Sequence, residues 1–166
     1  MMVPAMLTNG VISKQFYDWL EANGFFTAPA STKYHGAFEG GLYEHSKAVA
    51  KELIKLTDRL GLIWQRPESP SIVGIFHDLC KIDQYKLNES GNYDYNKDML
   101  LTGHGDKSII LLSQFMTLTE EEIMCIRYHM GAYAKEDWHS FDVAIKKYPN
   151  VLYAHTADMI ASKLYV

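Results

Sequence analysis

A histidine and an aspartate stand next to each other, as His77 and Asp78, in a segment that is otherwise strongly apolar. Burying an aspartate in such surroundings is costly unless a metal ion or a hydrogen-bonded partner meets its charge. Imidazole and carboxylate groups are also ligands of divalent transition metals. On a helix the two side chains would project about 100° apart, which still lets both reach one metal ion. The dipeptide alone is equally consistent with a buried pair bonded to the backbone.

Further candidate ligands recur along the chain, each near apolar residues: His45, His104, His129 and Asp158. A single histidine on an apolar face is more often a core residue with satisfied hydrogen bonds than a ligand. These residues, however, fall in successive predicted helices, and a helix bundle can focus side chains from several helices on one point in its core. Together with the His77-Asp78 pair they predict a metal centre.

The order H…HD…H…H…D resembles that of the HD-domain metal-dependent phosphohydrolases, and most closely the HD domain of bacterial 3′-end exoribonucleases. The resemblance extends over residues 38–164 and rests on the words GGLYEHS at 40–46, GIFHDLCK at 74–81, LTGHGDKSI at 101–109, IRYHMG at 126–131 and LYAHTADMIASK at 152–163. Cys80 departs from the family pattern, because many members have glycine before the lysine. The family exonucleases also carry a nucleic-acid-binding domain, for which we expect no room here.

The resemblance implies a binuclear centre with one metal ion at His45, His77, Asp78 and Asp158, a second at His104 and His129, and Asp78 bridging them. Mixed nitrogen and oxygen ligands suit Mn, Fe, Ni, Co or Zn better than Mg or Ca. Such a centre activates water for attack on phosphorus. We therefore expect hydrolysis of a small phosphorylated substrate, with a nucleotide as the leading candidate.

Lys81 follows His77 by one helical turn, so its amine can reach a phosphate bound at the metal ions. We expect Asp78 and Lys81 to act in catalysis, and Lys81 also to contact the substrate. Tyr43 and Tyr133 are further substrate-binding candidates, because their rings can stack on a base or sugar. A solvated lysine and an ordinary aromatic core are the simpler interpretations of these residues.

Apolar residues at helical spacing predict the elements that must position this site. The expected helices cover residues 13–23, 42–60, 71–81, 103–116, 119–129 and 142–147, with a last one from 149 or 150. Ser13 is the expected N-cap of the first helix, and Thr119 opens the fifth with a capping box to Glu122. Residues 25–40 are expected to form a loop, in which Lys33, His35 and Gly36 could close over substrate.

Two alternating runs rich in tyrosine flank residues 88–91 and predict a small β-hairpin within residues 84–96. The expected fold is therefore an all-α HD-domain bundle of about six or seven helices with one minor hairpin. We expect a single domain over residues 1–166, in which 1–37 pack on the rest as an N-terminal helix and loop.

Composition narrows the range of partners. The formal net charge of −4 and the pI near 5.9 disfavour extended nucleic-acid binding, which relies on many lysine and arginine contacts. The two cysteines form no CxxC pair, and no apolar run approaches the roughly 20 residues that span a bilayer. We expect a cytoplasmic protein without membrane contact. A homo-oligomer is possible, since HD proteins often pair.

Two other functions remain open at this stage. The ligand pattern also resembles that of the di-iron HD oxygenases, which cleave C–C or C–P bonds, although Lys81 and the exonuclease-like words favour hydrolysis. A non-catalytic HD module that binds a nucleotide is the second alternative. Among hydrolase substrates, the sequence does not choose between nucleoside monophosphates, deoxynucleoside triphosphates, cyclic nucleotides and short oligonucleotides.

Overall fold

The structure is a computed structural model that describes residues 2–131 and 138–165. Helices dominate it, and the described strands form one antiparallel hairpin, which confirms the predicted all-α bundle with a small hairpin. Its elements are α1 (Val3–Thr8), α2 (Lys14–Ala22), α3 (Gly41–Leu60), α4 (Ser69–Phe76), a 3₁₀ helix (Leu79–Asp83), β1 (Tyr85–Leu87), β2 (Tyr93–Tyr95), α5 (Gly105–Ser113), α6 (Glu120–Arg127), α7 (Trp138–Lys147), α8 (Asn150–Ile160) and a π-helical turn (Ala161–Tyr165).

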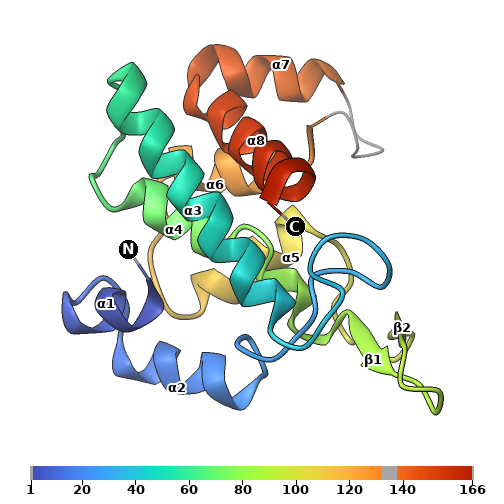
Figure 1. The fold of residues 1–166 in the computed structure, drawn as a ribbon. Helices are drawn as coiled ribbons and strands as arrows, with labels where there is room; N and C mark the ends of the chain where they lie inside the picture. Colours follow the sequence, from blue (N-terminus) through green and yellow to red (C-terminus); the bar gives the residue numbers. More distant parts are fainter. Residues whose placement is uncertain (1, 132–137, 166) are drawn as a thin grey trace.

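The long helix α3 is the centre of the bundle, with α4 and α8 packed against it (Figure 1). The approach of α3 to α4 depends on Gly74, because a Cβ atom there would lie 2.3 Å from the Cα of Ala50. Helix α6 packs on α4, α5 and α8, while α1 and α2 close one end of the core and the hairpin projects from the body. Helices α3, α4, α6 and α8 therefore meet around one interior region.

Several sequence signals mark the beginning or end of a helix at the position that was expected. The Ser13 side chain caps α2, Gly61 follows α3 in a left-handed conformation, and Thr119 and Glu122 form a capping box at α6. Helix α1 was not predicted, and α7 begins at Trp138 rather than at residue 142. None of the described helices is both long and apolar enough to cross a membrane.

The predicted helix over residues 71–81 is wrong at its C-terminal end. Helix α4 stops at Phe76, Asp78 leaves helical geometry with φ −103° and ψ 20°, and the chain tightens into the 3₁₀ helix. The ring Nδ1 of His77 donates a hydrogen bond to the carbonyl oxygen of Gly74 at 2.8 Å. A continuing α-helix would give that carbonyl to the backbone N–H of Asp78. The histidine thus occupies a helix end.

Replacing Gly74 by alanine should cost about 3 kcal/mol of unfolding free energy, because the added methyl group overlaps the backbone of Ala50. Gly91→Ala is the matched control. No atom lies within 4 Å of the Cβ it would add, and only its left-handed φ of 78° opposes the change, at about 1 kcal/mol. Urea unfolding of both variants measures the difference. Equal losses would contradict the close packing of α3 on α4.

Candidate metal centre

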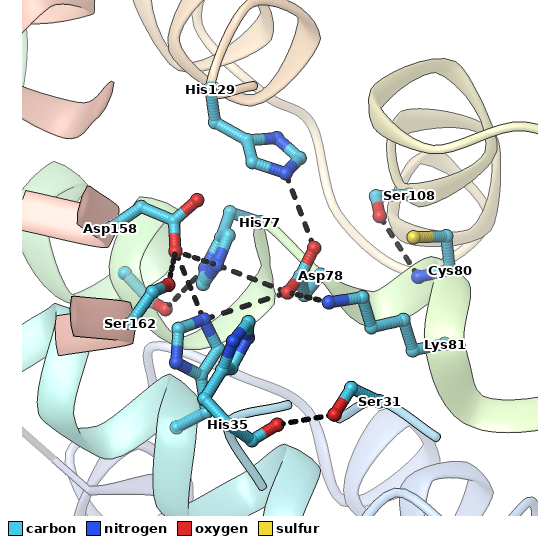
Figure 2. Close-up of polar contacts among 12 residues, drawn as sticks. Ser31, His35, His77, Asp78, Cys80, Lys81, Ser108, His129, Asp158 and Ser162 are labelled. Carbon is cyan, nitrogen blue, oxygen red and sulfur yellow. Dashed lines mark hydrogen bonds and ion pairs between the residues drawn. The ribbon is translucent and has the colours of Figure 1, made fainter. Parts of the chain in front are cut away.

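Five of the predicted ligands converge in the interior where four helices meet. Figure 2 labels His77, Asp78, His129 and Asp158 among them. Helix α3 contributes His45, the end of α4 contributes His77 and Asp78, the end of α6 contributes His129, and α8 contributes Asp158. The first four are buried, and the Asp158 side chain retains only 15% exposure. The structure therefore brings together residues more than one hundred positions apart in the chain.

The two oxygens of Asp78 face different histidines. Its Oδ2 lies 3.6 Å from Nε2 of His45 and 3.5 Å from Nε2 of His77, whereas its Oδ1 lies 3.2 Å from Nε2 of His129. Oδ1 of Asp158 joins the first group, 3.0 Å from Nε2 of His45 and 3.7 Å from Nε2 of His77. A carboxylate whose two oxygens face different groups of histidines has the arrangement of a bridging ligand.

Four of the polar atoms that face this centre lack hydrogen-bond partners among the described residues. Nε2 of His45, His77 and His129 and Oδ1 of Asp78 are all buried, and none of them has a partner of ordinary geometry within the described residues. Leaving one such group unsatisfied costs roughly 1–3 kcal/mol. A shared cation would satisfy them all, since each offers a lone pair to the same space. Two groups of three side chains, one of His45, His77 and Asp78 and the other of His77, His129 and Asp158, have ligand atoms close enough together to hold a metal ion.

Backbone hydrogen bonds fix the orientation of two of these rings. Nδ1 of His77 donates to the carbonyl of Gly74 at 2.8 Å, and Nδ1 of His129 donates to the carbonyl of Ile126 at 2.7 Å. A neutral imidazole that carries its proton on Nδ1 presents a bare lone pair on Nε2, as metal-binding histidines do. For His129 this lone pair points at a carboxylate oxygen, an unfavourable contact unless positive charge lies between them.

The electrostatics of the centre favour added positive charge. Burial alone would lower the pKa of His77, but the Asp78 and Asp158 carboxylates raise it to about 10. Burial alone would raise the pKa of the Asp78 carboxyl, but the charges of Lys81 and His77 hold it well below its usual range. Either a proton or a metal ion can supply this charge. A metal ion bound here would therefore compete with protonation of His77.

Lys81 lies beside the cluster and opens toward a cavity of about 880 Å³. Its Nζ donates to Oδ2 of Asp78 at 2.7 Å, and its side chain is 11% exposed. Burial would lower the pKa of Lys81, but the charge of Asp78 raises it, so the amine stays protonated. Asp78, His129 and Asp158 form part of the cavity wall. Three of the predicted ligands and the predicted catalytic lysine thus line the same cavity.

Supporting contacts hold the ligands in place. Nδ1 of His155 donates to the carbonyl of His129 at 2.7 Å, and the Ser162 hydroxyl donates to Oδ1 of Asp158 at 3.1 Å. Sequence reasoning did not single out Ser162, although its position one helical turn after Asp158 was the available signal.

Cys80 is buried, and burial raises the pKa of its thiol to about 12, so it is an unreactive packing residue.

The remaining predicted residues have different positions. His104 is exposed at the N-cap of α5 and belongs to neither group of potential ligands among the described residues. Partial burial of its ring lowers its pKa, and the charge of Asp78 opposes this effect. Tyr43 packs on Phe25 and Phe26 and is not among the residues lining the cavity. Tyr133 lies outside the described residues.

Comparison with known proteins gives one informative relative. The chain is 28% identical over 134 residues to dihydroneopterin 2′,3′-cyclic phosphate phosphodiesterase of Methanocaldococcus jannaschii, a match that covers 79% of this chain and 51% of that protein. The chain thus spans about half the length of this relative. No family model and no solved structure matches the chain. Nothing in these comparisons supports the resemblance to 3′-end exoribonucleases.

Removing one imidazole from the cluster should abolish tight metal binding. For His77→Ala we expect at least a tenfold loss of bound transition metal, because the variant removes a donor that faces both Asp78 and Asp158. Elemental analysis after dialysis against Mn²⁺ or Fe²⁺ measures it. His139→Gln, at an exposed position of α7, is the matched control and should bind metal as the wild type does. Full metal content in His77→Ala would contradict the proposed ligand set.

Proposed function

We propose that this chain is a metal-dependent phosphohydrolase of the HD-domain type that cleaves a phosphate ester of a small molecule. The observation that carries the proposal is the set of buried, unpartnered atoms, Nε2 of three histidines and Oδ1 of Asp78. Asp78 and His129, two of the residues that carry these atoms, line a cavity that Lys81 also lines. The similarity to a protein named as a phosphodiesterase supports the same reaction class.

The donor set fits a divalent transition metal. His45, His77, Asp78 and Asp158 would hold one ion, while His129, the second oxygen of Asp78 and His104 would hold another. The divided contacts of Asp78 support this assignment. Bound there, such ions supply a Lewis acid and lower the pKa of water enough to make a nucleophile available near neutral pH.

The side chains of the protein then have distinct tasks. Asp78 keeps its negative charge, because the neighbouring cations hold its pKa low, and so remains available as a ligand and as the partner of Lys81. The Lys81 ammonium lies where it can contact a phosphoryl oxygen and stabilise the charge that develops during phosphoryl transfer. A cationic side chain in this position suits an anionic phosphoryl group, as hydrolysis of a phosphate ester requires.

The cavity admits more than a phosphate group. Its volume of about 880 Å³ falls within the range of small-molecule sites, and Phe38, Met130 and Met159 give it an apolar part. We propose a substrate that joins an organic ring system to a phosphate ester, such as a nucleotide or a cyclic phosphodiester of the kind named for the relative. The single-domain organisation, the cytoplasmic location and a homo-oligomeric state remain predictions.

Turnover of phosphate esters tests the proposed reaction. Protein loaded with Mn²⁺ or Fe²⁺ should hydrolyse bis(4-nitrophenyl) phosphate and 2′,3′-cyclic AMP equally well with and without oxygen. Lys81→Ala should lower kcat/KM by about 10²–10³-fold, since it removes a charge that stabilises the transition state. Lys86→Ala is the control, because Lys86 lies on the exposed hairpin and pairs with Asp98. Strict dependence on oxygen would instead establish the oxygenase.

A binuclear centre makes a second, separable prediction. His104→Ala should lower the bound metal from about two ions per chain to about one, because only the position that includes His129 loses a ligand. Metal titration followed by calorimetry measures the stoichiometry. If the variant keeps the wild-type stoichiometry, His104 is not a ligand. If the wild type itself binds one ion, the centre is mononuclear.

A further inference from the structure

His35 lies at the metal centre without belonging to it. Its ring packs on the ring of His45, with centroids 4.6 Å apart and planes inclined by 43°. His35 lines the same cavity as Lys81, and both residues are labelled in Figure 2. It is not a member of either group of ligand atoms among the described residues. Its Nε2 is nevertheless buried, with no hydrogen-bond partner in the described part of the chain. A buried ring nitrogen of this kind calls for a partner that enters the cavity from outside.

The loop that carries His35 is held in a fixed shape. Ser31 Oγ donates to the carbonyl of His35 at 2.8 Å and accepts from the backbone N–H of Tyr34 at 2.9 Å, while the N–H of Ala30 donates to the carbonyl of Gly36 at 2.8 Å. Gly36 has a left-handed φ of 66°, and a Cβ atom there would lie 2.6 Å from the Cβ of Ala30. The imidazole is therefore presented to the cavity by a preorganised wall.

The surroundings of His35 indicate what its partner is. Lys81, another cavity residue, contributes a positive charge, and the cluster behind the ring would be cationic once loaded with metal. A neutral imidazole in this position can donate one hydrogen bond from Nε2. A fixed hydrogen-bond donor between the metal-loaded cluster and the Lys81 ammonium group suits an anionic oxygen. The proposed reaction places a phosphoryl group, which carries such oxygens, in this cavity.

We propose that His35 is a substrate-binding residue that donates a hydrogen bond from Nε2 to a non-bridging phosphoryl oxygen, opposite Lys81. The proposal rests on the proposed phosphohydrolase function for the identity of the anion. It extends that function by assigning the loop before α3 a direct role in holding the phosphate. His35 thereby acts on substrate affinity, whereas the metal ligands act on metal content.

Two substitutions at His35 distinguish the contribution of ring packing from that of the Nε2 hydrogen-bond donor. His35→Phe keeps a ring to pack on His45 but has no donor, whereas His35→Gln places an amide N–H near the former Nε2. Both are compared with the wild type and with His139→Gln, a substitution at an exposed position of α7. For each metal-loaded protein, calorimetry gives the Kd of inorganic phosphate, and elemental analysis gives the metal content.

We expect His35→Phe to bind inorganic phosphate about 10- to 100-fold more weakly at unchanged metal content, since hydrogen bonds to charged groups contribute this much. His35→Gln should recover most of the affinity, and with bis(4-nitrophenyl) phosphate the Phe variant should raise KM more than it lowers kcat. Unchanged phosphate affinity in His35→Phe, or loss of metal from it, would overturn the proposal. Phosphate binding decides this point even if no ester is turned over, an outcome that would refute only the proposed reaction.

Discussion

The structure depends on how the buried charge of Asp78 is compensated. Its carboxylate is 2% exposed, and nearby positive charge keeps its pKa low. Burial removes the hydration of this charged group, so the surrounding residues must supply positive charge in its place. Lys81 meets one oxygen, but the other oxygen faces the bare Nε2 of buried His129. The Asp78 oxygens also lie near His45 on α3 and His129 at the end of α6, so the close approach of α3 to α4 at Gly74 belongs to the packing that surrounds this charge.

The same local hydrogen-bond arrangement positions two of the candidate ligands, His77 and His129. His77 and His129 each lie just beyond the end of a helix, and each ring donates to the carbonyl three residues earlier. Both bonds fix the tautomer that exposes Nε2. At His77 the bond also satisfies the Gly74 carbonyl at the end of α4, so the end of this helix and the orientation of the ring are linked.

Much of this arrangement could be predicted from the sequence. Periodicity located α3 and α8, and the ordered His and Asp residues identified the five side chains that converge. The end of α4 escaped prediction because apolar spacing continues past Phe76, and a side-chain hydrogen bond, not a breaking residue, stops the helix. His35 was only a weak candidate, since a loop has no periodicity to show which way a ring points. Tyr43 was assigned by residue type, and its aromatic neighbours fix its position instead.

The central claim is that the convergent imidazoles and carboxylates hold a metal ion, and the location of that ion tests it most directly. Crystals of the protein prepared with Mn²⁺, measured at wavelengths on either side of the manganese absorption edge, would give its position from anomalous differences. The account predicts a peak within about 2.0–2.4 Å of Nε2 of His45 and His77 and of both buried carboxylates. Strong manganese peaks only elsewhere, with ordered water among these side chains, would contradict it.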